Sequence, residues 1–303
     1  MKVNYRLAEE RDLEGAHHIM VEALDQFALQ MGRPLVEVDF EDYLPLWHHF
    51  SATSDEGFWV AEVRGKLAGF ACSIVRDGLW FLSHLMVLPE FQGQGIGGEL
   101  LARTLQGAQR EEAKIIATYA DASNWPSISL YARHGMFPRV PVLRMRGSIV
   151  SMRLDQREVE PPEFQVAGLS EETVAALGEI DEKIRGARRH IDHRYWLGAP
   201  EMRCYLFREG KRAIAYAYLS DEGHIGPLAT LKGEHIRPIL GFAIDRLSDQ
   251  GVDTFIVRVP GINTEAVSLL YERGFTIQEM HLLISSLPFG RWENYIISRP
   301  SLL

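Results

Sequence analysis

Three glycines mark the point where an apolar strand gives way to a helix. Residues 92–97 read Gln-Gly-Gln-Gly-Ile-Gly, after the apolar run at 85–89 and before leucines 100, 101 and 105. Glycine lets the backbone approach a ligand closely. The first amides of a helix have no acceptor inside it and face outward at its positive dipole end. The junction therefore predicts a loop built to bind phosphate.

The residue order separates this loop from two other phosphate loops. A full dinucleotide fingerprint follows the first strand of its unit and is completed by an acidic residue about 20 positions on, whereas a nucleoside-triphosphate loop needs Gly-Lys-Ser/Thr. The segment does not follow the first strand of its unit, and it contains no Gly-Lys-Ser/Thr. Its own order is Q-x-x-G-x-G, with Gln92 first, Gly95 fourth and Gly97 sixth.

A second block, residues 124–136, reads as a short helix with both ends marked. Asn124 is a favourable N-cap, Pro126 suits the first turn, and Gly135 suits the left-handed position after the last turn. From the residues alone, Asn124 is either a cap or a ligand contact. Tyr131 is either a half-buried core residue or a functional one.

Together the two blocks resemble the GNAT superfamily of N-acetyltransferases, which use acetyl-coenzyme A (acetyl-CoA). The resemblance implies that the amides of the loop bind the pyrophosphate and that a splayed strand holds the pantetheine arm. It implies that Tyr131 is the general acid that protonates the CoA thiolate. The implied cofactor-binding residues are Leu85, Met86, Val87, Gln92, Gly93, Gln94, Gly95, Ile96, Gly97, Gly98, Asn124 and Ser127.

The general base is less well specified. Presenting an alkyl amine as the free base at pH 7 costs roughly 4.6 kcal/mol, so a base or a water chain is useful. His84, Asp121 and Glu90 all lie near the ends of central strands. Of these we select His84, because its ordinary pKa suits neutral pH, although a histidine in a strand is more often structural. The segment 40–50, with Tyr43, Trp47 and Phe50, either lines the acceptor pocket or belongs to the core.

The net charge, the apolar runs and the length of the chain restrict its expected partners, location and number of domains. A formal charge of −9 disfavours nucleic acid and favours amines. We find no apolar run of about 20 residues and no secretory signal, so we expect a cytoplasmic protein without membrane attachment. The length of 303 residues predicts two domains.

Cysteine and metal chemistry are not expected. Cys72 and Cys204 lie in separate apolar segments, which indicates buried structural thiols. The pairs His17–His18 and His48–His49 are adjacent, so their side chains diverge on a helix and cannot share a metal; we expect surface histidines.

The second half repeats the order of the first. Gly210–Lys211 lies 145 positions after Gly65–Lys66, and Asn263 and Gly274 lie 139 positions after Asn124 and Gly135. Residues are therefore missing between the hairpin and the last helix, around 226–237, and no Q-x-x-G-x-G occurs there. Leu270 stands in the place of Tyr131, so we interpret the second copy as degenerate.

The expected fold is mixed α/β, with two tandem GNAT-like domains of mainly antiparallel sheet, each with a splayed central strand. The expected boundaries are a catalytic domain at 1–152, a linker at 153–164 containing Pro161–Pro162, and a degenerate domain at 165–303. The final strands of the first domain are expected at 140–146 and 148–153.

The predicted activity is transfer of an acetyl group from acetyl-CoA to an amine by direct attack, without a metal. The acceptor is a small-molecule amine or a protein amine. The alternative is a non-catalytic module that binds acyl-CoA as a sensor or scaffold.

Overall fold

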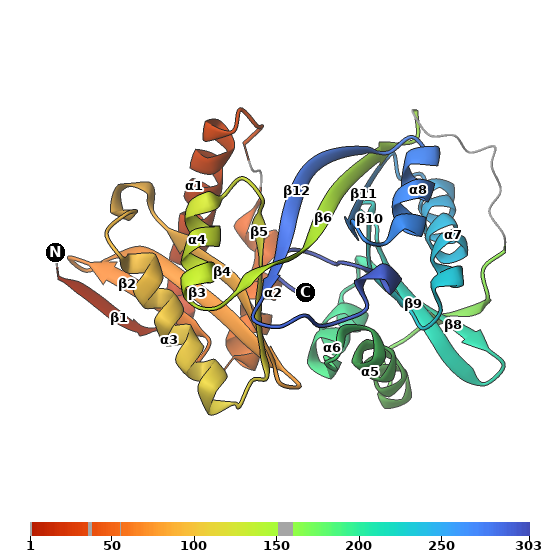
Figure 1. Cartoon of the computed structure of the whole chain (residues 1–303), viewed down its shortest axis with the longest axis horizontal. Coiled ribbons are helices and arrows are strands. Elements are labelled where there is room, and N and C mark those ends of the chain that lie inside the picture. The colour runs from red at the N-terminus through yellow and green to blue at the C-terminus, as the bar shows by residue number, and fades with distance from the viewer. Residues whose placement is uncertain (1, 36–37, 55, 151–159) are drawn as a thin grey trace. The chain divides into compact units, whose positions relative to one another are not determined.

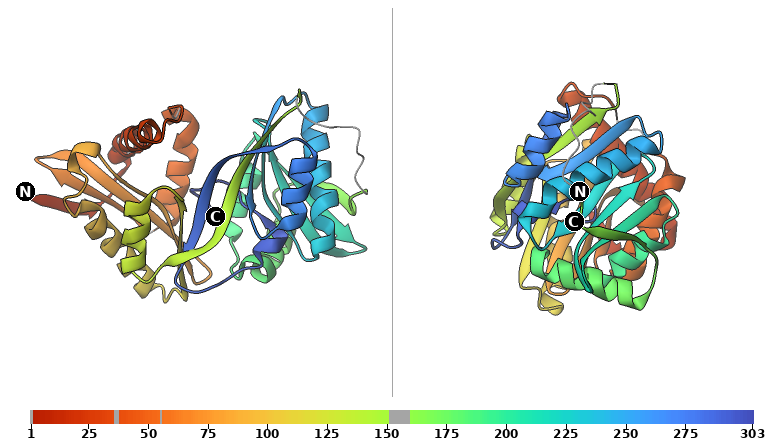
Figure 2. Two further views of the ribbon diagram at one scale, coloured as in Figure 1. Left: turned by 45° about the horizontal axis from the view of Figure 1, so that its top comes forward. Right: turned by 90° about the vertical axis from the view of Figure 1, so that its right-hand side faces the viewer.

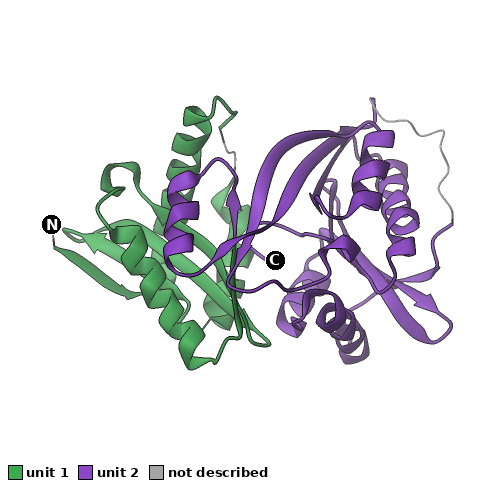
Figure 3. Ribbon diagram, viewed as in Figure 1, with its two compact units in different colours: residues 1–118 green, residues 119–303 purple. Residues whose placement is uncertain are grey.

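The computed structural model describes residues 2–35, 38–54, 56–150 and 160–303. The chain forms two compact units, residues 1–118 and 119–303, shown in green and purple in Figure 3. Among the described residues, no helix has the length and apolar character needed to cross a bilayer.

The first unit is a sheet covered on both faces by helices. Its strand order is β1-β2-β3-β4-β5, antiparallel except for the parallel pair β4 and β5. Helix α3 covers one face and α1 and α2 the other, as Figures 1 and 2 show. The elements are β1 (Val3–Leu7), α1 (Leu13–Gln30), α2 (Phe40–Thr53), β2 (Phe58–Val63), β3 (Lys66–Arg76), β4 (Leu79–Val87), α3 (Ile96–Arg110) and β5 (Ile115–Asp121).

The pairing between strands β4 and β5 ends about halfway along β4. Their parallel pairing runs from Leu79 with Ile115 to Leu82 with Thr118 and ends there, whereas β4 continues to Val87. A bulge at Ser83 falls at the same point, because Leu82 pairs with Ser73 and His84 already pairs with Cys72. Bulges increase local twist and redirect a strand. The expected mixed α/β class with a splayed central strand is confirmed.

The second unit contains the remaining helices and strands. Its strand order is β12-β6-β11-β10-β9-β8-β7, with β13 beside β10. Helices α7 and α8 pack on a core of buried aliphatic and aromatic residues that includes Leu240, Phe255 and Leu270. The elements are α4 (Trp125–Arg133), β6 (Phe137–Ser148), β7 (Glu163–Ala167), α5 (Glu171–Arg185), α6 (His190–Gly198), β8 (Met202–Glu209), β9 (Arg212–Ser220), β10 (His224–Thr230), α7 (Ile236–Asp249), β11 (Thr254–Pro260), α8 (Thr264–Glu272), β12 (Thr276–Ser285) and β13 (Tyr295–Ile296).

The last strands of the two sequence copies are exchanged. Strand β6 follows the first copy in sequence, yet it pairs along its length with β11 and β12 of the second copy. Strand β12, which ends the second copy, lies next to β5 of the first. At this junction the amide of Ala122 donates to the carbonyl of Met280, 3.0 Å away. Strand β6, which follows the first copy in sequence, therefore belongs to the sheet of the second unit.

The exchange explains where the chain divides. The compact units separate at 118/119, well before residue 152, because β6 belongs to the sheet of the second copy. The single strand β6 covers the strand expected at 140–146. Of the strand expected at 148–153, residues 149–150 form a turn and residues 151–153 lie outside the described residues. Residues 151–159, which hold most of the expected linker, lie outside the described residues. The repeat boundaries 1–152 and 165–303 stay a prediction.

The contact between β6 and the second copy gives a stability prediction. A methyl group at Gly147 of β6 would lie 2.6 Å from the buried Phe275 ring, whereas Gly168 has open space around it. We expect Gly147→Ala to lower the free energy of unfolding by about 1–3 kcal/mol in urea denaturation. Gly168→Ala is the matched control, and equal effects of the two substitutions would argue against this packing.

Candidate active site

The loop between β4 and α3 is shaped by two glycines in left-handed conformations. Gly93 has φ 72° and Gly95, the N-cap of α3, has φ 86°. Residues with a side chain rarely adopt such angles. A Cβ at either position would meet no atom within 4 Å, so the loop faces open space. Residues 92–95 are exposed, and the following Ile96 anchors the helix in the core.

Six consecutive amides of this loop are unused. In the part of the chain that the structure describes, the amides of Gly93 through Gly98 have no hydrogen-bond acceptor. The helical ladder begins only with the amide of Glu99, which donates to the carbonyl of Gly95 at 3.1 Å. Gln92 differs from the expectation, because its amide donates to the carbonyl of Pro89 and is not available. The loop is thus an array of main-chain donors at the positive end of α3.

The two glutamine side chains brace the loop. The side-chain amide of Gln92 donates to the carbonyl of Val87 at 3.0 Å, and that of Gln94 donates to the carbonyl of Glu90 at 2.9 Å. Gln92 also lies 3.3 Å from the side-chain oxygen of Gln26 on α1. These bonds fix the loop in place, so the donors need little rearrangement to meet an anion.

The expected pantetheine strand lies just before the loop. Leu85, Met86 and Val87 are half-buried and pair with Ala71, Phe70 and Gly69 of β3. The opposite edge of this part of β4 has left β5, since pairing with β5 ends at Leu82. Val87 lies beside the loop, with its side chain 3.7 Å from the position of a Cβ on Gly97. The strand edge and the free amides therefore follow one another along the chain.

His84 is enclosed by aromatic rings. Its ring lies 5.0 Å from that of Trp47 and about 6 Å from those of Phe50 and Phe70. Both ring nitrogens are bonded: Nε2 is 3.0 Å from the hydroxyl of Tyr43, and Nδ1 is 2.8 Å from the hydroxyl of Ser83. The side chains from segment 40–50 thus divide, with Trp47 and Phe50 in the core and Tyr43 half-buried at its rim.

This environment does not suit His84 as the general base. Burial lowers the pKa of His84 to about 3, far below the value near 10.4 of an alkyl ammonium. Its nitrogens are also occupied. The histidine instead holds the hydroxyl of Tyr43, which lies 41 positions away on α2. The reasoning from sequence missed this pairing, because nothing local in either segment signals it.

The other predicted residues lie on α4 in the second unit. Asn124 caps this helix, with its side-chain oxygen accepting from the amide of Ser127 at 3.2 Å. Within the described residues, the side-chain NH₂ of Asn124 has no partner. Tyr131 is buried, with 5% of its surface exposed. Asp121, another candidate base, accepts from the amide of Ser123 at 2.7 Å, and Glu90 is exposed.

The remaining candidates are structural. Cys72 and Cys204 are buried, and burial raises the pKa of Cys204 to about 12. His17 and His49 are also buried, which corrects the expectation of surface histidines. The described residues contain no cluster of three or more side chains of the kinds that bind metals.

Comparison with known proteins shows what this chain is similar to. Residues 21–136 match the Acetyltransferase (GNAT) family. An uncharacterized N-acetyltransferase of Archaeoglobus fulgidus is 29% identical over 141 residues, which cover 42% of this chain and 88% of the relative. Residues 21–136 of this chain are therefore similar in sequence to the GNAT family of acetyltransferases, and the fold and the loop agree with that similarity.

Two solved structures share the fold over nearly the whole chain. A putative acetyltransferase from Pyrococcus horikoshii has a TM-score of 0.77 at 17% identity, covering 99% of this chain and 96% of that one. A tandem GNAT protein from the clavulanic acid biosynthesis pathway has a TM-score of 0.59 at 12% identity, covering 95% and 99%. These likenesses show the tandem fold.

The burial of His84 gives a pH prediction. The folded protein keeps this ring neutral to about pH 4, whereas the unfolded chain binds a proton near pH 6.5. Protonation of the unfolded state therefore lowers stability as pH falls below 6.5. We expect the His84 ring signals, assigned with a His84→Gln variant, to stay unchanged in NMR spectra from pH 8 to 4.5. A titration midpoint near 6.5 would contradict this.

Proposed function

We propose that the chain transfers an acetyl group from acetyl-CoA to an amine. The observation that carries the proposal is the run of six free amides at Gly93–Gly98, next to a strand edge released from its neighbour. Phosphates bind well at such helix starts, and each charge-assisted hydrogen bond contributes roughly 1.5–3 kcal/mol. The diphosphate of CoA fits the amides of Gly93–Gly98, and its pantetheine arm fits the edge of Leu85–Val87 that β5 has left, where the Val87 carbonyl already accepts from Gln92.

The reaction requires two proton movements. The amine must lose a proton before it attacks the thioester carbonyl, and the departing CoA thiolate must gain one. A phenol of ordinary pKa near 10 is suited to donate to the thiolate. We assign this role to Tyr131, the residue that matches the acid of the family. Asn124 is assigned to the coenzyme, because its side-chain NH₂ is free to donate while its oxygen caps α4.

The acceptor is an amine, on a small molecule or on a protein. The acidic balance of the chain, with a formal charge of −9, favours cationic acceptors through long-range attraction. Assays of CoA release with a panel of polyamines, amino sugars and peptide N-termini as acceptors will identify the class of acceptor. Binding of acetyl-CoA without turnover of any amine would instead support a sensor.

The loop can be tested by filling it. In Gly95→Val, the side chain would occupy the open face of the loop and strain a residue at φ 86°. We expect the Kd for acetyl-CoA, measured by calorimetry, to rise roughly tenfold or more, since at least one charge-assisted bond is lost. The control is Gly65→Val in the β2–β3 turn, where φ is 77° and the space is also open. An unchanged Kd in Gly95→Val would contradict the assignment.

The role of Tyr131 as general acid is tested by removing its hydroxyl oxygen. We expect Tyr131→Phe to lower kcat by roughly a hundredfold or more, the range typical of general acid catalysis. The Kd for acetyl-CoA should stay within about twofold. Tyr271→Phe, on the exposed surface of α8, is the control. Full activity of Tyr131→Phe would exclude the phenol as proton donor.

A further inference from the structure

The second copy contains the same splayed strand as the first. Strand β10 pairs in parallel with β11 only at His224 and Ile225, as β4 pairs with β5 only up to Leu82. The same bulge follows: Ile225 pairs with Leu219 and Leu228 with Ala217, as Leu82 pairs with Ser73 and Leu85 with Ala71. By this register, Leu228 and Ala229 correspond to Leu85 and Met86.

In the second copy, a later segment of the chain lies between the two strands that splay apart. Strand β13 pairs antiparallel with β10, with Ile296 opposite Leu228 and Tyr295 opposite Ala229. The next residue, Ile297, bridges to Arg258 of β11, so the segment lies between the two strands. A Cβ on Gly226 would lie 2.5 Å from the carbonyl oxygen of Ile297, which shows how closely the backbones approach. Tyr295, Ile296 and Ile297 are fully buried.

The helix cap of the second copy also bonds to this segment. Asn263 caps α8 as Asn124 caps α4, with its side-chain oxygen accepting from the amide of Ala266. Its side-chain NH₂ donates to the carbonyl of Tyr295 at 3.2 Å. The equivalent NH₂ of Asn124 has no partner within the described residues. The group left free in the first copy is therefore satisfied by the chain in the second.

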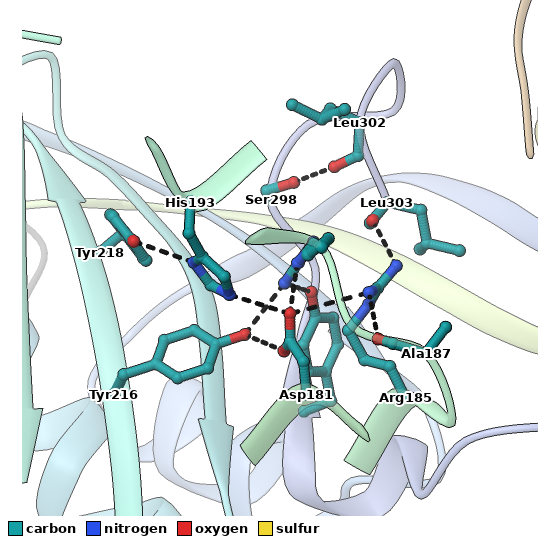
Figure 4. Close-up of polar contacts among 11 residues, drawn as sticks. Asp181, Arg185, Ala187, His193, Tyr216, Tyr218, Ser298, Leu302 and Leu303 are labelled. Carbon is teal, nitrogen blue, oxygen red and sulfur yellow. Dashed lines mark hydrogen bonds and ion pairs between the residues drawn. The ribbon is translucent and has the colours of Figure 1, made fainter. Parts of the chain in front are cut away.

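A buried polar network fixes the segment in place. The Arg189 guanidinium donates to the hydroxyl of Tyr295 at 2.5 Å and to Asp181 at 2.6 Å. Burial opposes ionisation of Asp181, but Arg189 and His193 outweigh it and keep its pKa below the usual range. Figure 4 shows Asp181 at the centre, with His193 and Tyr216 bonded to it. Removing one partner of such a buried set is strongly destabilising, so the network holds β13 firmly.

Part of the corresponding turn of the second copy is also bonded within the chain. The amide of Lys232 donates to the Thr230 hydroxyl, and that of His235 donates to the carbonyl of Lys232. The carboxylate of Glu209 bonds to Lys232 at 2.7 Å and to His235 at 3.1 Å. The Lys232 ammonium and the His235 ring at this turn are therefore already paired with a carboxylate.

We propose that β13 occupies, in the second copy, the place that the pantetheine arm takes in the first, so that the chain binds one acyl-CoA. The proposal rests on the function proposed above and adds the ligand state of the second copy. The second copy is a self-liganded domain whose main-chain and Asn263 donors are used by residues 295–297. It contributes strand β12 and stability to the fold, without a second coenzyme.

Two measurements on the full-length protein test this. Calorimetry with acetyl-CoA should give one site per chain in the wild type. Hydrogen exchange should show new protection at residues 83–99 on adding acetyl-CoA, and none at 226–238. Without ligand, the amides around Leu228 and Ala229 should already exchange more slowly than those around Leu85 and Met86.

The outcomes separate this inference from the proposed function. Two sites per chain, or new protection at 226–238, would overturn the inference and leave acetyl-CoA binding intact. The Gly95→Val variant gives a further check: its single site should weaken roughly tenfold or more with no new protection at 226–238, whereas new protection at 226–238 in this variant would place a coenzyme in the second copy. A wild type that binds no acetyl-CoA would refute the proposed function and this inference with it.

Discussion

The main-chain hydrogen-bonding capacity released where β4 leaves β5 is the feature on which the candidate site depends. A strand inside a sheet has both edges occupied, and an unpaired buried edge is costly. Here pairing stops at Leu82 and Thr118, a bulge at Ser83 turns the strand, and Gly93 and Gly95 keep the next amides free. The bulge, the end of the β4–β5 pairing and the glycine loop all leave backbone groups unpaired. These exposed groups follow one another along the chain.

The second copy shows what the same splay does without a ligand from outside. Its bulge and helix cap are retained, but β13 pairs with Leu228 and Ala229 and takes the bond of Asn263. In both copies, therefore, the strand edge exposed by the splay needs a hydrogen-bonding partner. One copy leaves the position open, and the other fills it with a segment held by Arg189 and Asp181.

Local signals in the sequence predicted much of the fold and the loop. Glycines at 93, 95 and 97 and the cap at Asn124 act through neighbouring backbone, so their effect is visible in a short window. The strand exchange of β6 and β12, the insertion of β13 and the bond between Tyr43 and His84 join distant segments. No window of sequence contains both partners. His84 is an example. Its suitability as a base depends on side chains of α2 that surround it, and these lie far from it in the sequence.

The account is tested most directly at the amide protons themselves. Amide NMR signals of Gly93, Gly95 and Gly97 should move downfield during titration with coenzyme A, because hydrogen bonds to phosphate deshield the proton. Gly210 and Gly233 of the second copy should not move. If the three loop glycines keep their positions at saturating coenzyme, the free amides do not hold the diphosphate.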